Sequence, residues 1–102
     1  MAQTWNLIGN ALYGVQEFDR ALFAYKEAVL CGEPGVHLAD SFFNVGRTYF
    51  ALDNMVESID FLMGSLEVYE FFAIDMGRTL HTSATVAAIH YQLGHALQDK
   101  KP

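Results

Sequence analysis

The sequence predicts an all-α protein of about five helices, and three observations support this. Apolar residues between positions 18 and 30 follow the three-four spacing of a helix with one buried face. Glycine and proline interrupt such segments, most clearly at 31–35, where Gly32 follows a helix end and Pro34 lies just beyond it. A pattern of small and large apolar residues also recurs around Gly9, Gly46 and Gly94.

The first two helices are expected at about 4–13 and 18–30, joined by a turn at 14–17. Thr4 is a suitable N-cap for the first helix, because its hydroxyl can accept a hydrogen bond from an unpaired backbone N–H. The buried face of the second helix is expected to contain Phe18, Ala21, Leu22, Tyr25, Ala28 and Val29.

The third helix is expected at about 36–52, and the fourth should begin after Asn54, which can serve as its cap. The inward side chains of the third should be Phe42, Val45, Tyr49 and Phe50. Those of the fourth should be Val56, Ile59, Leu62, Met63, Leu66 and Tyr69, with a continuation through Phe71, Phe72 and Ile74. This last part is apolar almost all round, which predicts burial on more than one side.

A fifth helix is expected at about 82–98, capped by Thr82 or Ser83. Its apolar face, formed by Ile89, Leu93 and Leu97 together with His90, has no following helix in this sequence to cover it. We therefore expect this face to be completed by a partner or by a second copy of the chain.

The recurring pattern resembles the tetratricopeptide repeat, which reads W-x₂-L-G-x₂-Y, then A-x₃-F, then P. The residues that carry the first match are Trp5, Ile8, Gly9, Leu12, Ala21, Tyr25, Ala28 and Pro34. The second match runs through Phe42, Val45, Gly46, Tyr49, Ser58, Leu62 and Ser65, and the third through His90, Leu93, Gly94 and Leu97. In this family the glycine lets the second helix of each pair lie close to the first.

The resemblance implies a right-handed α-α superhelix, a solenoid with two full repeats and the first helix of a third. The repeats would cover about 3–34, 36–76 and 82–99 of a single domain or fragment. Gly9 and Gly46 are 37 residues apart and Gly46 and Gly94 are 48 apart, both longer than the standard 34. The stretch 66–70 (Leu-Glu-Val-Tyr-Glu), followed by Gly77, His81 and Thr82, resembles the longer kinesin light chain type.

Composition excludes several other classes of function. A net charge of −6 argues against binding of nucleic acid, which requires a basic surface to contact the phosphates. No apolar run reaches the ~18 residues of a membrane span, and no signal peptide is recognisable. The single cysteine, Cys31, excludes an internal disulfide, and we expect it to be an inert, at least half-buried thiol. A cytoplasmic protein without a membrane partner is the expectation.

Motifs for catalysis or for binding a cofactor are absent from the sequence, so we expect no enzyme, no cofactor and no metal. There is no nucleophile elbow, phosphate loop or metalloprotease motif. His90 and His95 are five residues apart, which places them on different faces of a helix rather than at the i, i+4 spacing of a metal pair.

Binding of a protein segment is the function that remains, because in this family the first helix of each pair lines a concave groove. Amide side chains there can pair with the backbone of an extended peptide, and aromatic side chains can provide pockets for its side chains. The predicted peptide-binding residues are Asn6, Asn10, Tyr13, Phe43, Asn44, Arg47, Phe50, Tyr91, Gln92 and His95.

The family's carboxylate clamp can be tested against these positions. It requires two asparagines, two lysines and an arginine. Asn10 and Asn44 occupy the asparagine positions, but Asn6, Ala88 and Gln92 occupy the cationic ones. Without those cations the clamp is not expected, and an acidic chaperone tail is disfavoured as the ligand.

Two hypotheses of function follow. The first is an interaction module, acting as a scaffold or adaptor, that holds an extended or helical segment of a partner in its groove. The alternative is a structural assembly segment, in which apolar faces such as that of the last helix dock neighbouring repeats or another subunit, including a homo-oligomer.

Overall fold

The computed structural model describes residues 2–32, 36–75 and 84–100, and all of its regular structure in these ranges is α-helical. The helices are α1 (Ala2–Gly14), α2 (Phe18–Cys31), α3 (Val36–Ala51), α4 (Met55–Asp75) and α5 (Ala84–Lys100). The prediction of an all-α chain with five helices near these positions is confirmed.

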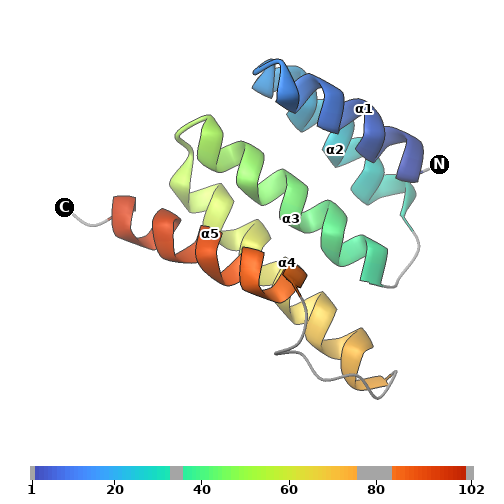
Figure 1. Ribbon diagram of the computed structural model, residues 1–102, viewed down its shortest axis with the longest axis vertical. Helices are drawn as coiled ribbons and strands as arrows, with labels where there is room; N and C mark the ends of the chain where they lie inside the picture. The colour runs from blue at the N-terminus through green and yellow to red at the C-terminus, as the bar shows by residue number, and fades with distance from the viewer. Residues whose placement is uncertain (1, 33–35, 76–83, 101–102) are drawn as a thin grey trace.

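The helices form two layers (Figure 1). Each helix packs against the next one in the chain, and α3 also contacts α1 and α5. In Figure 1, α1, α3 and α5 face the viewer, and α2 and α4 lie behind them. The molecule measures 37 × 37 × 18 Å, and its smallest dimension matches two layers of helices about 10 Å thick.

The turns that close α1–α2 and α3–α4 have the same geometry, with every participating residue shifted by 37 positions. Gln16 and Asp53 both have a φ of 65°, and their N–H groups donate to Tyr13 and Phe50 at 3.0 Å. The next N–H in each turn donates five residues back, over 2.9 Å. This pair of bonds is the Schellman motif, here built without glycine in the left-handed position.

Close approach within the two hairpins follows the same 37-residue shift. A Cβ atom on Gly9 would lie 2.6 Å from the Tyr25 ring, and one on Gly46 would lie 2.7 Å from Cγ of Leu62. Tyr25 and Leu62 are fully buried. The expectation that these two glycines admit the following helix is therefore confirmed.

The hydroxyl groups of two serines in α4 donate hydrogen bonds to backbone carbonyl oxygens of α3. Ser58 Oγ donates to the carbonyl oxygen of Gly46 at 2.8 Å, and Ser65 Oγ donates to that of Ala39 at 2.7 Å. Both hydroxyls are buried, so they hold α3 and α4 at short range along two turns of helix.

Several local expectations are wrong. Thr4 lies inside α1 rather than at its cap, because the helix begins at Ala2. Val56 and Met63 are 51% and 52% exposed rather than inward. Phe71 is 67% exposed, so the apolar end of α4 is not buried on all sides there.

The last helix differs from the expectation in the face that it leaves open. Ile89 is fully buried, and Leu93 is half-buried, because this face packs toward α4. His90 and Leu97 are exposed, as expected, and Tyr91 and Gly94 are exposed beside them. Nothing lies within 4 Å of a Cβ added to Gly94, so this third glycine is not a close-approach point.

Cys31 is exposed at the end of α2, which contradicts the expected buried thiol. Pro34, Gly77, His81, Thr82 and Ser83 lie outside the described residues, as does the bend that would accommodate the longer repeat. The side chains of Phe72 and Ile74 also lie outside them. None of the helices in the described ranges combines the length and the apolar character needed to cross a membrane.

Candidate functional site

The ten predicted binding residues come from α1, α3 and α5, the three helices of one layer. The structure gathers eight of them into three groups along that layer. Two groups join α1 to α3, and the third joins α3 to α5.

The first group is a chain of polar side chains between α1 and α3. Asn6 Nδ2 donates to Ser41 Oγ at 3.0 Å, and Asn44 Nδ2 donates to Asn6 Oδ1 at 3.3 Å. Asn6 and Asn44 are half-buried and Ser41 is buried. These amides therefore bond one another across the helix interface, which leaves each with only part of its capacity for a ligand.

The second group surrounds the guanidinium of Arg47, which reaches from α3 to the α1–α2 hairpin. It stacks on the Tyr13 ring at 4.0 Å from the centroid. Nη2 donates to the Tyr25 hydroxyl at 2.9 Å and to Asn10 Oδ1 at 3.3 Å, and the Tyr25 hydroxyl donates to the same Asn10 oxygen. Such stacking and forked bonding is geometry that lysine cannot reproduce.

Burial raises the pKa of Tyr25 above its ordinary value of 10.0, while the hydrogen bond from Arg47 acts in the opposite direction. The phenol is therefore neutral at pH 7. The Tyr25 hydroxyl accepts a hydrogen bond from Arg47 but does not neutralise the positive charge of the guanidinium.

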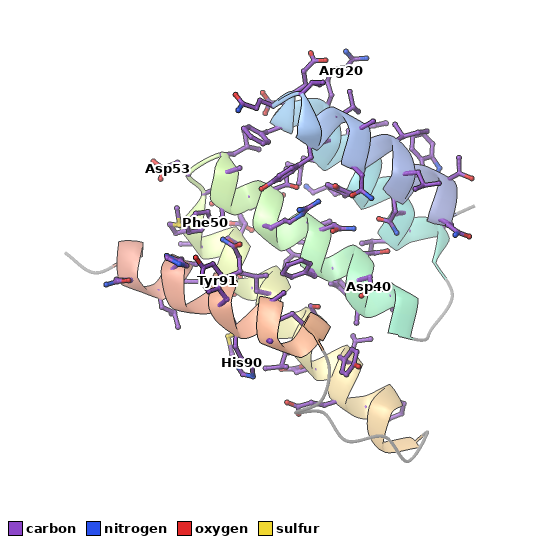
Figure 2. The ribbon with its side chains drawn as sticks, viewed as in Figure 1. Arg20, Asp40, Phe50, Asp53, His90 and Tyr91 are labelled. Carbon is purple, nitrogen blue, oxygen red and sulfur yellow. The ribbon has the colours of Figure 1, made fainter. Side chains whose placement is uncertain are left out.

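The third group is aromatic and lies between α3 and α5. His95 packs edge-on against Tyr91, with ring centroids 4.5 Å apart, and against Phe50 at 6.5 Å. Figure 2 shows Phe50 and Tyr91 on these neighbouring helices. Tyr91 is 69% exposed, so its ring extends the layer's surface into solvent.

Two further predicted residues, Phe43 and Gln92, are half-buried on α3 and α5. Leu7 on α1 is 62% exposed and adds an apolar side chain to the same layer. The face thus combines open apolar contacts at its ends with a polar centre around Asn10 and Arg47.

Sequence reasoning missed two members of this site, Ser41 and the hydroxyl of Tyr25. Tyr25 was assigned only a packing role, in a position where the family has phenylalanine. The hydroxyl was the available signal, because a buried tyrosine generally finds a hydrogen-bond partner for it. Ser41 has no such signal, since an isolated serine on a helix is common.

A separate hollow of about 250 Å³ lies between α1 and α2. Trp5 and Phe23 pack edge-on there, with ring centroids 6.2 Å apart. Its lining is completed by Ile8, Leu12, Arg20 and Ala24. Within the described ranges, no three His, Cys, Asp or Glu side chains come together as a metal-binding group.

No protein-family model matches this chain, and comparisons with curated proteins and with solved structures give no significant match.

Proposed function

We propose that this protein is an interaction module of the tetratricopeptide type, in which the face of α1, α3 and α5 holds an extended or helical segment of a partner protein. The observation that carries the proposal is the 37-residue equivalence of the two hairpins. Turn geometry at Gln16 and Asp53 and close approach at Gly9 and Gly46 repeat in register. In repeat architectures such equivalent units stack and create an extended binding surface.

The chemistry of this face supports a protein ligand. Exposed Leu7 and Tyr91 provide apolar contacts at opposite ends of the layer, and tyrosine is enriched among the residues that carry most of the energy in protein interfaces. Between them, Asn10 has an exposed amide whose Nδ2 makes no hydrogen bond to other described residues. That group can donate to a backbone carbonyl of a bound segment.

A second candidate function, assembly with another subunit, is favoured by two other surfaces. The Trp5–Phe23 hollow lies between α1 and α2 and is lined mainly by apolar side chains. Gly94 occupies the position at which Gly9 and Gly46 receive a following helix, yet it faces open space. A homo-oligomer or a neighbouring repeat would cover both.

Matched surface variants separate the two functions. One double variant, Leu7→Ser with Tyr91→Ala, removes the apolar ends of the proposed face. The control, Leu30→Ser with Phe23→Ala, makes the same kinds of change on α2 at side chains 78% and 61% exposed. Peptides would be selected against the wild-type chain from a displayed library, and their affinities for both variants measured by calorimetry.

We expect the face variant to lose the selected peptides by about tenfold or more, since each lost anchor costs roughly 1–2 kcal/mol, and the control to retain them. Loss only in the control would contradict the proposal and favour the surface around Phe23 and Leu30. Light scattering after size-exclusion chromatography tests the assembly function directly, because a dimer that becomes monomeric in the Phe23 variant would support it.

A further inference from the structure

Arg47 is held in one position by its neighbours before any ligand arrives. The Tyr13 ring covers one face of the guanidinium at 4.0 Å, and Nη2 is directed by its bonds to the Tyr25 hydroxyl and to Asn10. These contacts come from α1 and α2, whereas Arg47 belongs to α3. The side chain is therefore ordered by three helices, which lowers the entropy that a ligand would lose on binding it.

The hydrogen-bonding capacity of this guanidinium is not filled. It carries five N–H groups, and its two hydrogen bonds to described residues both use Nη2. Its Nε is buried without a hydrogen-bond partner, and Nη1 has none among the described residues. The buried Nε has no surface that a ligand could reach, so the donor open to a ligand is Nη1, which is not fully buried.

The charge of Arg47 is also not balanced. The three side chains that it contacts are an amide and two phenols, and within the described ranges no Asp or Glu oxygen lies within 4.0 Å of it. Arg20, by contrast, pairs with Glu17 at 3.1 Å, and Lys26 lies over the Tyr49 ring. Arg47 thus combines a fixed position, open donors and a missing counter-charge.

We propose that Arg47 is a carboxylate-binding residue, which receives one carboxylate of the partner segment with help from the amide of Asn10. This inference rests on the proposed function, because it places a chemical group of the partner on the α1–α3–α5 face. The planar guanidinium matches the geometry of a carboxylate, and a charge-assisted bond of this kind is stronger than a neutral one. The Asn10 Nδ2 group provides a neighbouring donor.

A single cation distinguishes this site from one for a phosphate group. A phosphate brings nearly two negative charges and three acceptor oxygens, and it is usually met by a cluster of arginines. In the part of the chain that the structure describes, Arg47 is the one cation in contact with Asn10, Tyr13 and Tyr25, which suits one negative charge. The carboxylate could belong to a chain terminus or to an Asp or Glu side chain, and both offer the same chemistry.

The test uses three peptide probes and nuclear magnetic resonance of the full chain. The first probe is acetyl-trialanine with a free carboxyl terminus, the second is its terminal amide, and the third is that amide with a central glutamate. We expect the Nε–H resonance of Arg47 and the Nδ2 resonances of Asn10 to shift saturably with the first or third probe and not with the second. The response to the first or to the third identifies the source of the carboxylate.

Variants separate a binding role from a structural one. Arg47→Gln should weaken binding of the responding probe by about tenfold or more, and Arg47→Lys, which keeps the charge without the fork, should weaken it by less. Arg20→Gln is the matched control and should leave it unchanged. Arg47→Lys preserves the test if Arg47→Gln fails to fold, which the backbone amide spectrum would reveal.

Equal shifts with the amidated probe, or none with either carboxylate probe up to about 10 mM, would overturn this inference. Library peptides that need Leu7 and Tyr91 but bind equally well without any carboxylate would overturn it while leaving the proposed function intact. Failure of the Leu7 and Tyr91 variants to affect binding, with probe shifts still present at Arg47, would instead contradict the proposed function alone.

Discussion

Replacing the marker glycines by alanine provides the sharpest test of the hairpin packing. Alanine is favoured over glycine in a helix interior by about 1 kcal/mol, so a site with free space should become more stable. Gly94 is such a site, because nothing lies within 4 Å of the added methyl group. Gly94→Ala should therefore stabilise the protein by about 0.5–1 kcal/mol.

Gly46→Ala should have the opposite sign. The new methyl carbon would lie 2.7 Å from Cγ of Leu62 and 3.2 Å from the backbone nitrogen of the same residue. Leu62 is fully buried, and a clash with its branch point and backbone cannot be relieved by rotating the end of the side chain. Overpacking of this kind costs about 1–3 kcal/mol, which exceeds the gain in helix propensity.

Urea unfolding followed by circular dichroism would measure both effects, with unchanged m-values as the check on two-state behaviour. Gly64→Ala is the matched control within α4, since a methyl group there also meets nothing within 4 Å. Gly46→Ala should melt below wild type and Gly94→Ala above it, with about 4–8 °C for each kcal/mol. If Gly46→Ala proved as stable as Gly94→Ala, the close approach of α3 and α4 would be refuted.

Three further predictions concern turns, buried hydroxyls and alkaline pH. Gln16→Gly and Asp53→Gly should each raise the free energy of unfolding by about 0.5–1 kcal/mol, because glycine relieves the strain of a positive φ. Thermal melts would detect the change, and a lower melting temperature would argue against the left-handed turn. Ser58→Ala and Ser65→Ala should each lower that free energy by about 1 kcal/mol, through loss of a buried hydrogen bond, and their effects should add in urea titrations. Because the pKa of Tyr25 is raised on folding, the unfolded phenol loses its proton first, so stability present below pH 10.0 should decline as the pH rises above it. Urea midpoints against pH should show a shallower decline in Tyr25→Phe, and an identical slope would contradict the assignment.

The helices and the interior of the two hairpins were predictable from the sequence because short-range periodicity determines them. Ala21, Tyr25 and Ala28 recur at helical spacing, and all three are fully buried. The fifth helix was harder to interpret, since apolar residues occur around most of its circumference. Ile89 was assigned to the open face, yet packing on α4 buries it completely.

The polar contacts of the site could be predicted only as positions, because they depend on which helix lies opposite. The side chains of Asn6 and Asn44 are bonded to each other across 38 residues of sequence. Arg47 was recognised as a residue of the face, while its contacts with Tyr13 and Tyr25 arise from the angle between α3 and the first hairpin. No local pattern encodes such an angle.

The central position of α3 has a consequence for how the molecule opens. This helix packs against all four of the others, so it connects the first hairpin to the rest of the molecule. Amide protons in α3 should consequently exchange with solvent more slowly than those of α1 or α5, which can separate from one side. A bound segment that spans the layer would contact both α1 and α5 and slow their separation from α3.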